Sequence, residues 1–152
     1  MLLSEALAER AEISNRLTQL KARLHTVARI QEGDQPDEDP HTLIKESDAL
    51  RARAEKLIRA INATNTATPF DGGNLTDALA HRDYLLASRR FYTDLADAAS
   101  ARQDRYSSSE IKYVATVNVA ELRKRADAFS KEYRELDTRI QQLNWQTDLV
   151  GL

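Results

Sequence analysis

The sequence predicts an all-α fold of long antiparallel helices, arranged as a four-helix bundle or as paired helical hairpins. Apolar residues recur at alternating spacings of three and four along four long segments, which is the heptad pattern of packed helices. The chain is 30% charged and 41% apolar, a balance that suits helices with one narrow apolar stripe. We therefore expect a single helical domain over residues 1–152, with helices at about 4–31, 40–63, 75–102 and 119–146.

The first two helices are expected to form an antiparallel hairpin. Asp39 followed by Pro40 is a typical helix start, because the Asp side chain accepts from free backbone N–H groups and Pro fits the first helical position. The acidic residues 31–40 between the two helices are interpreted as a solvated turn. The heptad series of the first helix is Leu3, Ala6, Arg10, Ile13, Leu17, Leu20, Leu24 and Val27, and that of the second is Leu43, Ser47, Leu50, Ala54, Leu57 and Ile61, widened by Ile44 and Ile58.

Residues 62–83 are the longest interruption of the helical pattern. Their Asn and Thr side chains compete with helix by bonding to their own backbone, and Asp71-Gly72 is a turn dipeptide. We therefore expect the second helix to stop near residue 63 and a third to begin at Leu75. Buried amides and hydroxyls need partners, so residues 62–73 are expected to pack against residues 102–117 as an ordered polar network.

The third and fourth helices differ in regularity. The third is apolar at Leu75, Leu85 and Leu86 but is interrupted by Arg82 and Arg89, whereas the fourth keeps strict spacing. Asn118 with Glu121 predicts a capping box at the start of the fourth helix. Residues 111–117 alternate apolar and polar side chains, so the pattern also permits a short two-stranded β ribbon with residues 66–70. The fourth heptad series is Val119, Leu122, Ala126, Phe129, Tyr133, Leu136, Ile140 and Leu143.

Composition argues against several classes of function. A net charge of -2 gives no electrostatic basis for nucleic-acid binding, and the absence of cysteine removes thiol catalysis and thiolate metal sites. No segment has the roughly 20 apolar residues that span a bilayer, and the first residues lack the pattern of an export signal. We expect a cytoplasmic protein that binds neither membrane nor nucleic acid and uses no cofactor.

Candidate chemistry is limited to one polar region. The three histidines lack metal-binding spacing, and no catalytic motif is present, so neither a metal site nor a catalytic residue is assigned. The run Gly72-Gly73-Asn74 precedes a helix start, where free N–H groups can hold an anion. A second polar cluster follows the third helix and offers cationic groups and hydroxyls. The candidate residues for an anion or small-ligand site are Asn65, Asp71, Arg82, Arg105, Tyr106 and Lys112.

Four blocks of the chain resemble a group of small bacterial proteins often labelled septicolysin. The blocks are IQEGDQPDEDP, INATNTATPFDGGNLTDALAHRD, DRYSSSEIKYVATVNV and ELDTRIQQLNWQTDL. The resemblance covers nearly the whole chain and includes its irregular segments. It implies an all-helical, oligomeric protein of uncharacterised function and supplies no catalytic residues. The label implies a cytolysin, but the chain lacks the cysteine, export signal and membrane-inserting segments that such an activity needs.

Two functions are consistent with these patterns. Nearly every patterned residue is explained by packing, so the leading hypothesis is a non-enzymatic assembly or interaction module that forms a homo-oligomer. Trp145 is interpreted as a packing anchor, with a subunit contact as one place for it. The alternative is a binding protein or enzyme that uses the polar segments 62–83 and 102–112 to hold a small anionic ligand.

Overall fold

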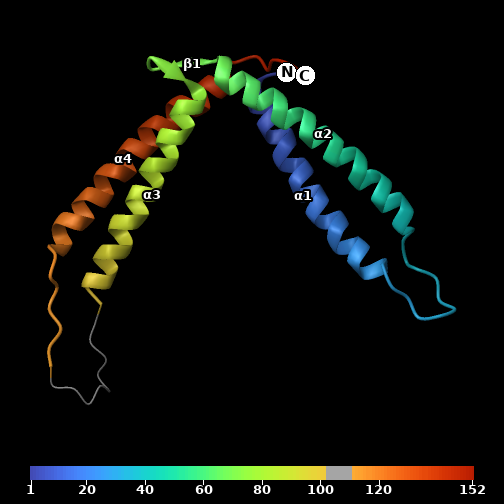
Figure 1. Ribbon diagram of the computed structural model, residues 1–152, viewed down its shortest axis with the longest axis horizontal. Coiled ribbons are helices and arrows are strands. Elements are labelled where there is room, and N and C mark those ends of the chain that lie inside the picture. Colours follow the sequence, from blue (N-terminus) through green and yellow to red (C-terminus); the bar gives the residue numbers. More distant parts are fainter. Residues whose placement is uncertain (102–110) are drawn as a thin grey trace. The chain divides into compact units, whose positions relative to one another are not determined.

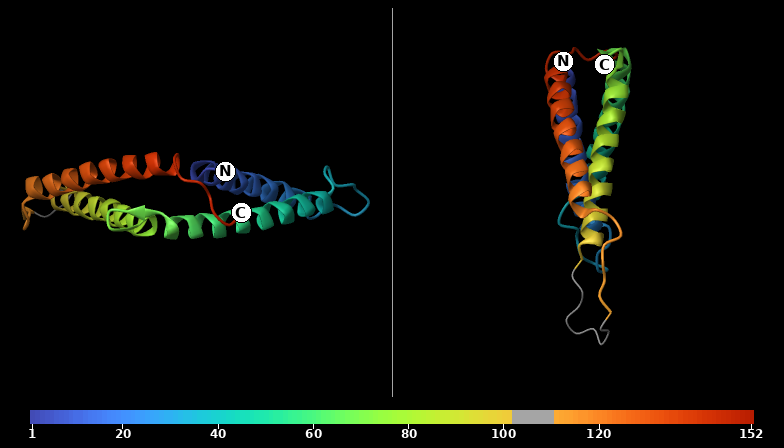
Figure 2. Two further views of the ribbon diagram at one scale, coloured as in Figure 1. Left: turned by 90° about the horizontal axis from the view of Figure 1, so that it is seen from above. Right: turned by 90° about the vertical axis from the view of Figure 1, so that its left-hand side faces the viewer.

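The computed structural model describes residues 1–101 and 111–152 and has the predicted all-α fold (Figure 1). The chain divides into two compact units, and each is described by itself. The first contains Met1–Leu75 and Gln141–Leu152, and the second contains Thr76–Ile140. Each unit is built on a pair of antiparallel helices, and Figure 2 shows the two helices of each pair side by side. The prediction of a single domain stays a prediction.

The first unit is a hairpin of α1 (Leu3–Val27) and α2 (Pro40–Ala67). Their heptad seams meet as predicted. Near the loop end of the hairpin, Leu20, Val27 and Leu43 form a buried apolar cluster. α1 ends at Val27 instead of near residue 31. Helical residues beyond Val27 would extend past the first turn of α2 and would have no facing helix to pack against. Asp39 caps α2 as predicted, accepting from the His41 backbone N–H at 3.1 Å and from the Thr42 hydroxyl at 2.9 Å.

α2 continues through the polar run to Ala67, so the prediction that it stops near residue 63 is wrong. The Thr hydroxyls do not compete with the helix but donate to carbonyls one turn back. Thr64 bonds to Ala60 O at 2.8 Å and Thr66 to Asn62 O at 3.0 Å. Side-chain bonds of this kind are compatible with helix, and burial of Thr64 against the hairpin holds the last turns in place.

A two-stranded antiparallel ribbon follows α2, formed by β1 (Pro69–Phe70) and β2 (Gly73–Asn74). Asp71 and Gly72 link the strands and have φ of +44° and +80°, the left-handed conformations that a two-residue hairpin turn requires. The turn dipeptide is therefore confirmed. The expected pairing of residues 66–70 with residues 111–117 is wrong, because β1 pairs with β2 and residues 111–117 form no strand.

The C-terminal residues complete the first unit. Leu2 and Asp148 form an isolated antiparallel bridge, flanked by a 2.8 Å bond from Leu3 N to Thr147 O. The Val150 backbone N–H then donates to the Thr64 hydroxyl at 3.0 Å. A buried Thr on α2 therefore anchors the end of the chain. Trp145 is 65% exposed in this chain, so its expected role as a packing anchor at a subunit contact stays a prediction.

The second unit pairs α3 (Leu75–Ala99) with α4 (Val119–Asn144). Asn118 caps α4 by accepting from the Glu121 N–H at 3.1 Å, which is one half of the predicted capping box. α3 ends at Ala99 instead of near residue 102. Just after the helix end, the Ser100 hydroxyl donates to the carbonyl of Ala96 at 2.8 Å. α4 ends two residues before the predicted position, in a turn that leads into the C-terminal residues.

Candidate functional site

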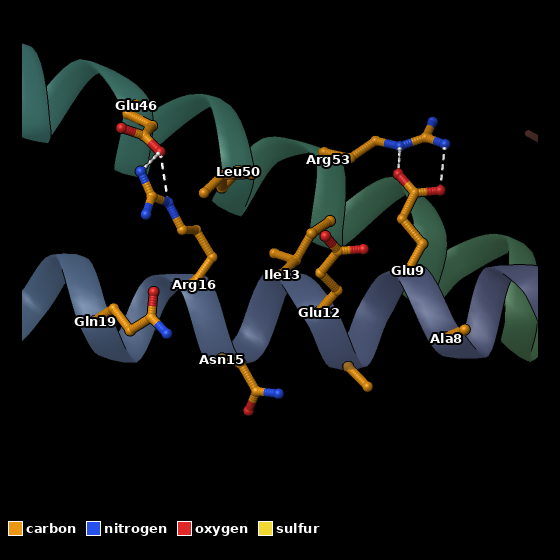
Figure 3. Close-up of a pocket in the computed structure, with 11 residues that line it drawn as sticks. Ala8, Glu9, Glu12, Ile13, Asn15, Arg16, Gln19, Glu46, Leu50 and Arg53 are labelled. Carbon is orange, nitrogen blue, oxygen red and sulfur yellow. Dashed lines mark hydrogen bonds and ion pairs between the residues drawn. The ribbon is translucent and has the colours of Figure 1, made fainter.

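A groove that carries polar groups lies along one edge of the α1/α2 hairpin (Figure 3). Both helices contribute to it, with acidic and basic side chains interspersed, and Asn15 points away from α2. Its floor is the apolar seam, at Ile13 and Leu50. The lining residues are Ala8, Glu9, Ala11, Glu12, Ile13, Asn15, Arg16, Gln19, Glu46, Leu50 and Arg53.

Ion pairs between the helices cross this groove at a regular spacing. Arg53 binds Glu9 through two bonds, Nε to Oε1 at 2.7 Å and Nη2 to Oε2 at 2.9 Å. Seven residues further along α1, Arg16 Nε donates to Glu46 Oε1 at 2.8 Å. Glu9 and Arg16 precede seam positions by one residue, so each pair lies beside the buried stripe and fixes the register of the two helices.

A third pair, Arg23 with Glu38, follows another seven residues on and extends this row beyond the groove. The hydrogen bond from Arg23 lowers the pKa of Glu38, and the hydrogen bond from Arg53 lowers the pKa of Glu9. The charged groups are thus engaged with each other. The row can hold α1 and α2 in register, and it offers no concentrated charge to a ligand.

The other edge of the α1/α2 hairpin is more apolar. Two shallow grooves there are lined by Leu17, Ile44 and Ile58, with Arg10 and Arg51 at their rims. Ile44 and Ile58, predicted to widen the α2 stripe, are exposed. Helix α1 therefore buries only part of the apolar surface of α2.

In the second unit, an aromatic cluster joins α3 to α4. Tyr92 stacks on Phe129 with ring centroids 5.7 Å apart, and Tyr84 meets the same ring edge-on at 6.1 Å. Arg125 covers the outer face of Tyr92, with its guanidinium carbon 5.5 Å from the ring centroid, and donates to the Tyr92 hydroxyl at 3.2 Å. Tyr92 and Phe129 are seam residues, and their contact resembles core packing. Tyr84 reaches Phe129 from outside the seam and is 56% exposed.

Arg82 lies within the α3/α4 seam, where the sequence pattern shows an interruption. Its Nη1 donates to Asp137 Oδ1 on α4 at 2.8 Å, and the two side chains are 25% and 31% exposed. An arginine at a heptad position is acceptable here because an acidic partner on the facing helix compensates its charge. Arg82, predicted as a ligand-binding residue, therefore connects the two helices.

The remaining candidate ligand residues are distributed over the chain. Asn65 is half-buried in the last turns of α2, Asp71 is in the ribbon turn, and Lys112 is exposed before α4. Arg82 lies about 26 Å along α3 from Ala99, the last residue of that helix, so Arg82 is not a neighbour of the end of α3.

Arg105 and Tyr106 lie outside the described residues, as does most of the segment 102–117 that was expected to pack against residues 62–73. The anion site and the polar network stay predictions.

Two structural findings bear on the classes of function. Within residues 1–101 and 111–152, no three His, Asp or Glu side chains are grouped as a metal site would need. No helix in the same ranges is both long enough and apolar enough to cross a bilayer.

Helix α3 carries a second apolar row that was not predicted from the sequence, which we call the outer row. Tyr84, Phe91 and Leu95 are its large members and are 56%, 62% and 37% exposed, although α4 covers the main seam of the same helix. Exposed alanines fill the positions between the large side chains. The signal is present in the sequence as a second series of three- and four-residue spacings. The outer row consists of Ala80, Tyr84, Ala87, Phe91, Leu95 and Ala98.

Comparison with known proteins identifies relatives without an assigned activity. A search of curated proteins found no match. One solved structure has a TM-score of 0.91 and 53% sequence identity, over 98% of each chain; it is described as the crystal structure of a functionally unknown conserved protein from Corynebacterium diphtheriae. The model of one protein family matches residues 10–149. The chain therefore belongs to the family of unknown function DUF6847.

Proposed function

We propose that this protein is a non-enzymatic assembly module that acts as a homo-oligomer. The observation that carries the proposal is the outer row of α3. This row is a second apolar series at heptad spacing, on a helix whose first seam already packs against α4. Isolated exposed apolar residues are ordinary on protein surfaces, whereas a continuous row at heptad spacing is a surface for another helix. Tyr84 and Phe91 are large aromatic anchors of the kind enriched at protein interfaces.

The charged groups support an interaction module over an enzyme. Glu9, Arg16 and Arg82, which lie in the groove or in a seam, each bind an oppositely charged group on the facing helix. Catalytic groups typically lie in a cleft with a pKa shifted for their task. Here the lowered pKa of Glu9 follows from its hydrogen bond with Arg53 and is explained by helix pairing.

Light scattering of the purified protein tests the proposal. We expect a mass at least twice the 17.2 kDa of one chain at micromolar concentration. Phe91→Ser and Leu95→Ser should each return the mass to that of one chain, because they remove large apolar groups from the outer row. The matched control is Ile44→Ser, which removes an exposed apolar side chain of the first unit and should leave the mass unchanged.

Two results would contradict the proposal. A wild-type mass of 17.2 kDa over the whole micromolar range would show that the chain does not assemble with itself. Dissociation by Ile44→Ser but not by Phe91→Ser would show that the outer row does not carry the assembly.

A further inference from the structure

The edge of the outer row carries charges of alternating sign at heptad spacing. Asp83 immediately precedes Tyr84, and Arg90 immediately precedes Phe91, so the two charged groups occupy equivalent positions one heptad apart. Both side chains are exposed. The ion pairs found among residues 1–101 and 111–152 involve neither of them.

The first unit shows how this chain uses the same positions in an antiparallel helix pair. Glu9 and Arg16 also precede seam positions by one residue, and they bind Arg53 and Glu46 on the antiparallel helix. Those partners are again seven residues apart, in reverse order. A helix edge that carries one acidic and one basic group at this spacing is therefore complementary to an antiparallel copy of itself.

We propose that two copies of the chain pair through the outer rows of α3, antiparallel about a two-fold axis next to Ala87, with Asp83 of each copy facing Arg90 of the other. This inference rests on the proposed homo-oligomer and specifies its interface. Asp83 and Arg90 are about 10 Å apart along the helix, so one axis midway between them forms both ion pairs at once. A parallel pair would place Asp83 level with Asp83 and Arg90 level with Arg90.

The apolar side chains fit the same arrangement. With the axis midway between residues 83 and 90, Phe91 of one copy lies level with the gap between Ala80 and Tyr84 of the second copy. Tyr84 likewise lies level with the gap between Ala87 and Phe91 of the second copy. Each large ring therefore has an alanine beside it, and this alternation of large and small residues allows two helices to approach closely.

Charge exchange tests the register and the orientation together. In the proposed pair, Asp83→Arg places two arginines face to face at both ion pairs, and Arg90→Asp places two acidic groups there. Each variant alone should weaken self-association by roughly tenfold or more, because like charges at an interface oppose binding. The double variant D83R/R90D should dimerise again, since the exchanged charges are once more complementary.

Mixing the two single variants gives a second, independent readout. Each D83R chain should bind an R90D chain, because that combination restores opposite charges at both contacts. At a concentration where each single variant is mostly monomeric, an equimolar mixture should therefore have a mass near twice 17.2 kDa. Formation of this mixed dimer also shows that both variants are folded.

The outcomes separate this inference from the proposed function. If the wild type and all three variants dimerise equally, the chain is an oligomer but its interface is not this antiparallel pair. If both single variants are monomeric and their mixture stays monomeric, the Asp83–Arg90 contact is also wrong. A monomeric wild type would overturn the proposed function and the inference together.

Discussion

Replacing Thr64 by Val is expected to release the C-terminal residues from α2. Thr64 is 1% exposed, and its hydroxyl both donates to Ala60 O at 2.8 Å and accepts from the Val150 N–H at 3.0 Å. Val has nearly the same shape, so the change removes the hydroxyl without leaving a large cavity. Ala60 O is an acceptor that loses one side-chain donor, whereas the Val150 N–H loses the hydroxyl that accepts its hydrogen bond.

The magnitude follows from the cost of an unpaired donor. Leaving a buried N–H without an acceptor costs about 1 to 3 kcal/mol. Val150 is partly exposed, so water can solvate its N–H in part and the lower end of the range applies. We therefore expect T64V to lower the free energy of unfolding by about 1 kcal/mol, and we expect the amide hydrogen of Val150 to exchange faster.

Thr66→Val is the matched control, because Thr66 lies on the same helix but its hydroxyl is exposed and bonds to Asn62 O. Its effect should stay within about 0.5 kcal/mol, as is usual for surface changes. Chemical denaturation measures the stability and native-state hydrogen exchange measures the Val150 amide. Equal stabilities of T64V and T66V, with unchanged exchange at Val150, would refute the assignment of Thr64 as the anchor.

Two further predictions address the seam and its ion pairs. Leu136→Ala, at a 9%-exposed position of α4, should destabilise the protein by roughly 2 to 5 kcal/mol. Val114→Ala, at an 83%-exposed position, should not, and equal denaturation midpoints of the two variants would place Leu136 outside the core. The hydrogen bond from Arg53 lowers the pKa of Glu9 below its ordinary value of 4.5, so the pair stabilises the folded state above that pH and the stabilisation is lost as the pH falls further. The stability difference between wild type and Glu9→Gln should therefore be present at neutral pH and shrink in acid, and a difference independent of pH would contradict this pairing.

The helices and their caps could be predicted because their causes are local. Asp39 with Pro40, and Asn118 before the fourth helix, combine side chains and backbone positions that are neighbours in the sequence. The turn at Asp71-Gly72 depends on residues that tolerate positive φ. In each case the residues that determine the structure lie within one helical turn of each other.

The errors arose where the partner is distant in the sequence. The Thr64 hydroxyl accepts from the Val150 N–H, which is 86 residues away, and no local pattern indicates that contact. The ion pair between Arg82 and Asp137 joins residues 55 positions apart, so local spacing could not indicate it, and the assignment of Arg82 to a ligand site stays a prediction. The row of Tyr84 and Phe91 was not predicted, because the stripe that packs α3 against α4 accounts for the helical pattern without it.

The most direct measurement of the central claim uses the absence of cysteine from the chain. In the proposed antiparallel pair, Ala87 lies next to the two-fold axis, whereas the two Ala80 residues are about 20 Å apart along the helices. A disulfide needs Cα atoms within about 7 Å. Oxidation of Ala87→Cys should therefore give a covalent dimer on a non-reducing gel, and oxidation of Ala80→Cys should not. Equal crosslinking of both variants would indicate a parallel pair, and crosslinking of neither would show that α3 does not meet a second copy of itself.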